Sequence, residues 1–133
     1  FGALFLFGGA LGFVPGIIRD DLYLGIFKVN PPHNVLHLCS GAIFLGASML
    51  GSGATRLWFL TFGMLYAAVA AIGFQVGDGM ICGIISNNQN DSWGHAGLAL
   101  AMLVIFFATS GQGTLGSRSL FGGPGDITNP SQR

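Results

Sequence analysis

Three histidines are the residues of this sequence most able to do chemistry. His33 and His37 are four positions apart, so on a helix their side chains share one face. His95 comes much later, and Asp91 lies four residues before it. Imidazole nitrogens ligate metal ions and occupy axial positions on cofactors such as haem, and a helical His-x₃-His is a usable ligand spacing. If His33 and His37 lie on one helix and His95 on another, the sequence predicts a polar cluster where these two helices meet.

We consider three interpretations of this cluster, in order of preference. In the first, the imidazoles are structural and hydrogen-bond to Asn and Asp side chains and loop carbonyls, because satisfied polar residues outnumber ligands. In the second, His37 or His95, with His33 as a further candidate, holds haem or chlorophyll as a cofactor. In the third, His33, His37, His95 and Asp91 hold Zn²⁺ or a similar metal ion.

The elements that must position these side chains are four apolar stretches, at about 1–18, 33–50, 57–76 and 93–109. Each is about 17 to 20 residues long, which as a helix crosses about 30 Å of hydrocarbon. We therefore expect an all-α fold, a bundle of four transmembrane helices over 1–109. The second and fourth helices then enter from the same side of the membrane, which places the three histidines near one interface.

The composition agrees with a membrane protein and excludes several other classes. Of the 133 residues, 8% are charged and 51% hydrophobic, against about 25% charged in soluble domains. A net charge of zero argues against nucleic-acid binding, which needs a basic surface. The sequence contains no GxSxG, P-loop or HExxH motif, so we expect no enzyme. The middles of the stretches carry no charge, which argues against a transporter.

Small residues repeat at every fourth position on two of the predicted helices. Such spacing lets helix backbones approach closely, which is how helices gain packing energy in lipid. The two predicted helix-packing rows are Gly8, Gly12 and Gly16 on the first helix, and Gly63, Ala67 and Ala71 on the third.

Basic residues predict the orientation of the bundle. Arg56, Arg118 and Arg133 lie on one side of it, and Arg19 and Lys28 lie on the other. Because cytoplasmic loops carry the excess of Lys and Arg, we expect both termini in the cytoplasm. The segment 110–133 is an extended tail rich in Gly, Ser and Pro, and we predict that it contacts other subunits.

Three separated motifs resemble the domain of unknown function 4383 family, which consists of small bacterial four-helix membrane proteins. The first is the turn that ends the first helix, Leu11 to Gly16, and the second is the run from Leu24 to Leu38 with Gly41 three residues on. The third is Asp91-Ser92-Trp93-Gly94-His95, in which Ser92 replaces the family's usual Asn. The resemblance implies four helices and a family role for His33, Asn34, His37 and His95, but no activity. Its further motif residues are Asn30, Gly41 and Trp93.

From these observations we expect a small, non-catalytic integral membrane protein. We interpret it as an accessory or structural subunit of a larger photosynthetic or respiratory complex. Its surroundings would be lipid and other membrane subunits, in a bacterial inner membrane or a photosynthetic membrane. The alternative is a ligand-binding membrane protein whose histidine cluster holds chlorophyll, haem or a metal ion.

Overall fold

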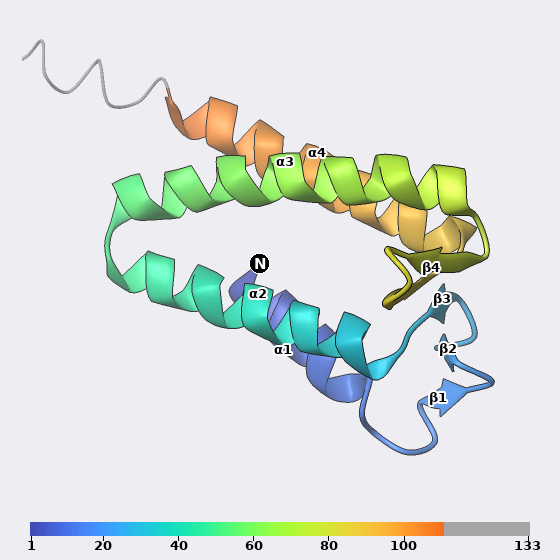
Figure 1. Ribbon diagram of the computed structural model, residues 1–133. Helices are drawn as coiled ribbons and strands as arrows, with labels where there is room; N and C mark the ends of the chain where they lie inside the picture. Colours follow the sequence, from blue (N-terminus) through green and yellow to red (C-terminus); the bar gives the residue numbers. More distant parts are fainter. Residues whose placement is uncertain (111–133) are drawn as a thin grey trace, which may run out of the picture.

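Four helices make up most of the fold, in a computed structural model that describes residues 1–110 (Figure 1). They are α1 (Gly2–Leu11), α2 (Pro31–Met49), α3 (Ser52–Val76) and α4 (Gln89–Ser110). The expectation of a mainly helical chain with four helices is confirmed. The predicted contact segment at 110–133 lies outside the described residues except for Ser110.

The first helix is shorter than the sequence suggested. It ends at Leu11 rather than at 18, because Pro15 has no backbone N–H to continue a helix and Gly16 adopts a φ of 90°. By contrast, α4 begins four residues earlier than the predicted start at 93. Asn88 and Asp91 each accept a 2.9 Å hydrogen bond from the other's backbone N–H, and this reciprocal cap starts the helix.

Two small antiparallel sheets, which the sequence analysis did not predict, join the helices at one end. Strands β1 (Ile18–Arg19), β2 (Leu22–Tyr23) and β3 (Phe27–Lys28) pair in that order between α1 and α2. Strands β4 (Gly79–Ile81) and β5 (Ile85–Asn87) pair between α3 and α4. Asp20 and Asp21 form the β1–β2 turn with φ angles of 51° and 60°, values typical of a tight hairpin turn. Because β3 precedes α2 and β5 precedes α4, both helices start at the end of the molecule that carries the sheets.

The helices pack as two antiparallel pairs, α1 with α2 and α3 with α4 (Figure 1). Close backbone approach occurs in both pairs: a Cβ atom added at Gly41 would lie 2.8 Å from the Gly2 carbonyl oxygen. A Cβ atom added at Gly63 would lie 2.8 Å from the Leu103 side chain. Both contacts show why small residues are needed between these helices.

The predicted rows of small residues are only partly placed at these contacts. Gly12 and Gly63 lie against a neighbouring helix, and Ala67 packs beside the core. Ala71 is exposed, and Gly16 lies outside α1 in open space. Because a helix repeats every 3.6 residues, a row at every fourth position drifts away from the contact face. The buried faces instead follow Gly2, Phe5 and Gly9 on α1, and Gly63, Tyr66, Ala70 and Gly73 on α3.

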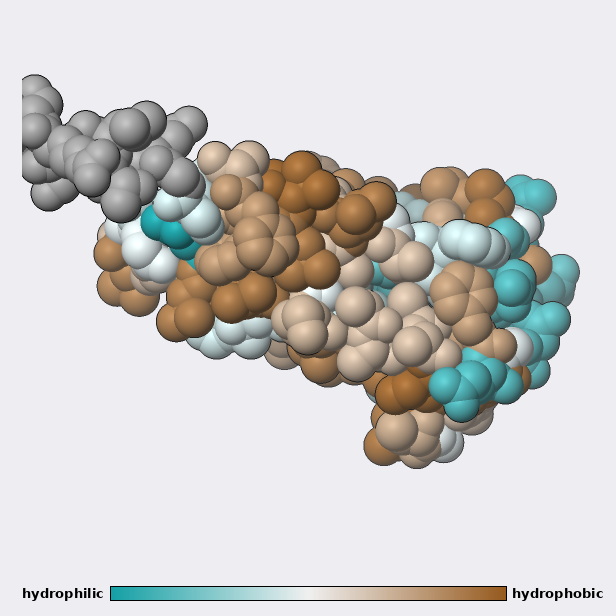
Figure 2. All heavy atoms as spheres, turned by 90° about the horizontal axis from the view of Figure 1, so that it is seen from above, coloured by the Kyte–Doolittle hydropathy of each residue, from teal (hydrophilic) through white to brown (hydrophobic). Residues whose placement is uncertain are grey.

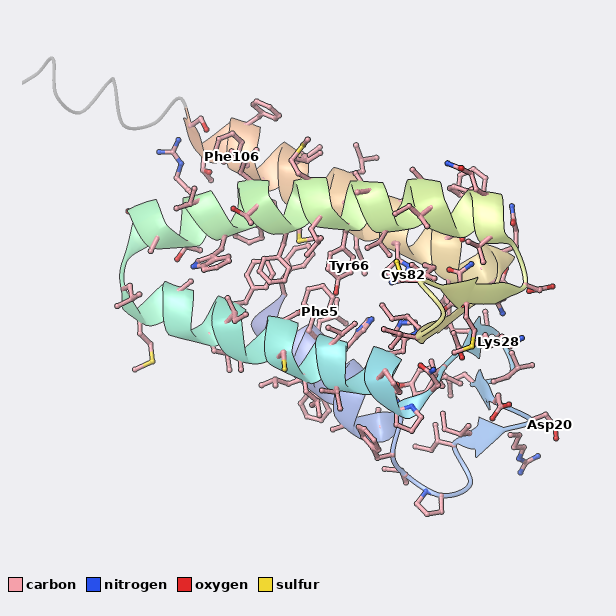
Figure 3. All side chains as sticks on the ribbon, viewed as in Figure 1. Phe5, Asp20, Lys28, Tyr66, Cys82 and Phe106 are labelled. Carbon is pink, nitrogen blue, oxygen red and sulfur yellow. The ribbon has the colours of Figure 1, made fainter. Side chains whose placement is uncertain are left out.

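An aromatic core fills the space between the two helix pairs. Phe5, Phe44, Phe62, Tyr66 and Met102 are buried there, and the rings of Phe44 and Phe62 have centroids 5.0 Å apart. Figure 3 shows Phe5 and Tyr66 between the pairs. We call these five residues the aromatic core.

On the face seen in Figure 2, the helices are largely apolar, whereas hydrophilic residues gather at the end that carries the sheets. Among the described residues, two helices are long and apolar enough to cross a membrane: α3, with 25 residues, and α4, with 22. An 18-residue stretch of each has a mean hydropathy of 1.9 in α3 and 1.6 in α4, and only 28% and 22% of these stretches are buried in the fold. A soluble core helix would be mostly buried, so length, hydropathy and exposure all point toward lipid.

Candidate metal centre

The orientation of His33 is fixed by the loop that precedes α4. Asn30 caps α2, and its Oδ1 accepts a 3.1 Å hydrogen bond from the His33 backbone N–H. The ring then turns so that Nδ1 lies 3.1 Å from the Ser86 carbonyl oxygen. A carbonyl can only accept, so Nδ1 carries the proton and Nε2 of the neutral ring holds a lone pair. His33 is thereby oriented as a ligand through Nε2.

Asn30 also holds the loop that supplies this carbonyl. Its Nδ2 donates to the Ile84 carbonyl oxygen at 2.7 Å, and its Oδ1 accepts from the Ser86 N–H at 3.3 Å. One side chain therefore caps α2 and places the Ser86 carbonyl beside His33. Histidines that bind metals commonly donate their second ring nitrogen to a backbone carbonyl in this way.

His37 lies one turn further along α2 and faces His33. Their Nε2 atoms are 3.2 Å apart, and the Phe5 ring packs edge-on against His37 with centroids 5.4 Å apart. Two nitrogens bound at 2.0–2.1 Å to one tetrahedral ion would be separated by about 3.3 Å. The spacing of this pair therefore suits a shared metal ion as well as a hydrogen bond.

His95 reaches the same point from α4. Its ring stacks on that of His33 with centroids 5.6 Å apart, and the residue is only 6% exposed. Its Nδ1 is buried and has no hydrogen-bond partner within the described part of the chain. A buried polar atom left without a partner costs about 1–3 kcal/mol. His33, His37 and His95 each offer one ligand atom, and these atoms lie within 4.8 Å of one another.

Asp91 has a different role from the one that the metal interpretation gave it. Its Oδ2 accepts hydrogen bonds from the backbone N–H groups of Asn88 and Lys28, both at 2.9 Å. The carboxylate thus caps α4 and ties β3 to it. Asp91 is not part of the compact group of three ligand atoms, although it lines the cavity beside them.

The remaining motif residues hold helices in place. Asn34 donates from Nδ2 to the Gly12 carbonyl oxygen at 2.8 Å, which satisfies the end of α1. Gly41 lies at the close approach to α1. Trp93 is 64% exposed and packs edge-on against Phe74, with centroids 4.9 Å apart.

The sequence analysis did not identify the side chain that holds the segment between α3 and α4 in place. Asn87 is fully buried, and its Nδ2 lies within 3.2 Å of the Gly73 and Gly77 carbonyl oxygens and the Ser92 hydroxyl. The continuous polar run from Ser86 to Ser92 before an apolar helix was the available signal, because such runs provide caps. Ser86 contributes its backbone carbonyl oxygen, so its residue type gives no sign of this role.

A cavity of about 310 Å³ opens beside the histidines. All three histidines and Asp91 line it. The other lining residues are mainly apolar, with Leu4, Phe5 and Gly8 from α1, Phe27 from β3 and Leu98 from α4. Such a mixture of an apolar wall and a few converging polar groups is typical of ligand sites.

The model of the family described as domain of unknown function (DUF4383) matches residues 1–108. The chain belongs to this family. The resemblance drawn from the three DUF4383 motifs is therefore confirmed. No curated protein and no solved structure matches the chain. The DUF4383 description names no activity.

Proposed function

We propose that this DUF4383 protein is a four-span membrane protein that binds one divalent transition-metal ion, with Zn²⁺ as the representative, through His33, His37 and His95. The convergence of three imidazoles from α2 and α4 within 4.8 Å carries the proposal. It replaces the structural interpretation as our preference. That interpretation explains His33, which bonds a loop carbonyl, but leaves the buried Nδ1 of His95 without a partner.

The donor set indicates which ion fits. Neutral imidazoles suit Zn²⁺, Cu²⁺, Fe²⁺ and Ni²⁺, whereas Mg²⁺ and Ca²⁺ prefer oxygen ligands. Three protein ligands leave a tetrahedral ion with one open position, which is the ligand number of catalytic rather than structural zinc sites. The His33–His37 spacing of 3.2 Å is close to that expected on an ion, so only His95 has to move closer.

The same geometry favours a compact ion over haem or chlorophyll. An axial imidazole needs a free face toward a flat macrocycle. His37 Nε2 instead lies 3.2 Å from His33 Nε2, and the His95 ring stacks on that of His33. One ligand atom of each ring lies within 4.8 Å of the other two, which suits a single ion between them.

The four-span arrangement is supported by the exposed apolar surface. α3 and α4 are long enough to cross, and α2 has 19 residues, about 28 Å of helix. α1 has 10 residues, about 15 Å, which is half of the hydrocarbon thickness; its place in the layer rests on its packing against α2. On the predicted orientation, with both termini cytoplasmic, the histidines lie at the opposite side. Arg118 and Arg133, on which that orientation depends, lie outside the described residues.

Metal analysis of the detergent-purified protein tests the proposal. The protein is stripped with a chelator, equilibrated with Zn²⁺, freed of excess ion and assayed for bound metal. We expect about one Zn²⁺ per chain, and none in the His33→Ala/His37→Ala/His95→Ala variant. A Cys39→Ser/Cys82→Ser variant is the matched control, because both thiols are exposed and should not contribute. Equal Zn²⁺ in the wild type and the histidine variant would reject the proposal.

A role as an accessory subunit of a larger membrane complex remains a second candidate. The supporting observation is apolar exposure in the loops, where lipid tails do not reach: Leu24 is 63% exposed and Ile84 is 58% exposed. Extraction in a mild detergent followed by native electrophoresis tests it. A subunit would migrate with partner chains, whereas migration at monomer size would reject this role. A photosynthetic or respiratory host would then be identified by what migrates with it.

A further inference from the structure

The cavity beside the histidines has polar and apolar lining residues. The polar ones include the three histidines, Asp91 and Asn34, and the apolar ones include Leu4, Phe27 and Leu98. Gly8 and Gly94 also line it, and neither fills it with a side chain. A Cβ atom added at Gly8 would meet only His37 Nδ1, at 4.0 Å. The space is therefore left open next to the metal ligands.

The cavity lies on the side of the molecule where the helices do not close. Successive helices pack against each other, α1 with α2, α2 with α3, and α3 with α4, but α1 and α4 are not closely packed within the described residues. Both α1 and α4 contribute cavity walls, together with Phe27 of β3. Leu4 at this edge is 60% exposed. A ligand that partitions into the bilayer can enter there.

The proposed metal ion would need one more ligand. Three imidazoles leave one tetrahedral position vacant, and all three line the cavity. On the basis of the proposed metal site, we propose that the cavity binds a small apolar molecule with a single hydroxyl oxygen. The oxygen would coordinate the ion while the apolar body lies against Phe27 and Leu98. The 310 Å³ of space lies within the range of small-molecule pockets, about 300–1,000 Å³.

Two probes that differ by one oxygen test this. Co²⁺ replaces Zn²⁺ in the detergent-purified protein, and its visible absorption reports changes in coordination. 2-Naphthol is then titrated in parallel with naphthalene, which has the same body and no hydroxyl. We expect 2-naphthol to shift the Co²⁺ spectrum saturably and naphthalene to leave it unchanged.

A pair of glycine variants locates the binding site. Gly8→Leu places a side chain in the cavity, whereas Gly46→Leu adds the same side chain to α2 where no atom lies within 4 Å of the added Cβ. We expect Gly8→Leu to retain Co²⁺ and to weaken 2-naphthol binding at least about tenfold, with Gly46→Leu unchanged. If Gly8→Leu fails to fold, the comparison between the two probes on the wild type decides alone.

The outcomes separate this inference from the proposed function. A protein that does not bind Co²⁺ would overturn the metal site itself. A protein that binds Co²⁺ but shows the same spectrum with and without 2-naphthol would overturn only the ligand. Equal 2-naphthol binding in the wild type and Gly8→Leu, with Co²⁺ bound in both, would also overturn it, because the molecule would then lie elsewhere.

Discussion

The aromatic core and the histidine end of the bundle are held together by different forces. In the aromatic core, Phe44 and Phe62 are about 95% buried and pack against other aromatic rings. At the histidine end, buried polar residues such as Asn87 and Asp91 are fixed by hydrogen bonds that span two elements. The core is specified by shape, and the other end by the pairing of donors and acceptors.

The difference shows where function lies. The side chains of the aromatic core carry a single hydroxyl, that of Tyr66, and are otherwise apolar. At the histidine end most polar side chains have hydrogen-bond partners, and the amide groups of Asn30 and Asn34 are examples. Within the described residues, two buried side-chain atoms lack a hydrogen-bond partner: Arg56 Nε near the start of α3, and His95 Nδ1. Only His95 lies beside two other imidazoles and a cavity, and this combination supports the proposed ligand there.

The largest expected effect lies in the core and should not reach the metal. Phe62→Ala removes a ring that packs against Phe44 and Tyr66, and should lower the free energy of unfolding by about 3–5 kcal/mol. Denaturant titration in detergent micelles measures it. Because Phe62 does not line the cavity, Zn²⁺ affinity should stay within a factor of two. A large loss of affinity would mean that the two regions are coupled.

The next effect belongs to the histidine end and should leave the core unaffected. His95→Ala removes one of three ligands and should lower Zn²⁺ affinity at least about 100-fold, or about 2.7 kcal/mol. In the metal-free protein the same change removes an unpaired buried nitrogen, so the free energy of unfolding should fall little or rise. Calorimetric Zn²⁺ titration and metal-free denaturation separate the two. Unchanged Zn²⁺ affinity would reject His95 as a ligand.

A smaller effect is expected at the residue that positions His33. Asn30→Ala removes the hold on the Ser86 carbonyl and should weaken Zn²⁺ binding about 10–100-fold, the usual cost of losing an outer partner. It also removes the helix cap, at about 1 kcal/mol of stability. Asn30→Asp keeps the acceptor for His33 and Ser86 and loses only the donor to Ile84. We expect it to recover most of the affinity; equal loss in both variants would contradict a positioning role.

The smallest effect is expected at an exposed motif residue. Trp93→Ala removes an edge-on contact with Phe74, worth about 0.5–1.5 kcal/mol beyond area burial. Thermal unfolding in micelles should show a small decrease in the midpoint, with Zn²⁺ stoichiometry unchanged. Loss of metal on this substitution would extend the site to the outer face of α4.

Much of the fold was predictable from the sequence for two reasons. Long apolar stretches indicate helices, and in a bundle of consecutive antiparallel helices every second helix starts at the same side. The residues of α2 to α4 were found to within five positions at each end, and the motif residues identified the family. The end of α1 was missed because its apolar run continues past the helix into a turn at Pro15 and Gly16. The small sheets were missed because each strand has only two or three residues, too few for an alternating pattern.

The candidate site was also predictable only in part. The alternating direction of successive helices was enough to place His33, His37 and His95 at one interface, and the structure brings them together. The role of Asp91 could not be separated from ligation, because a carboxylate four residues before a histidine suits either a cap or a metal. The Ser86 carbonyl and the cavity depend on how loops fold over the helix ends, and neither has a signature in residue types.

X-ray absorption spectroscopy of the Zn²⁺-loaded protein tests the central claim most directly, because it identifies the atoms bound to the ion. We predict about three imidazole nitrogens at 2.0–2.1 Å and one further light donor. His37→Ala should reduce the imidazole contribution by one. A zinc shell containing sulfur from Cys39 or Cys82, or one without imidazole scattering, would contradict the account.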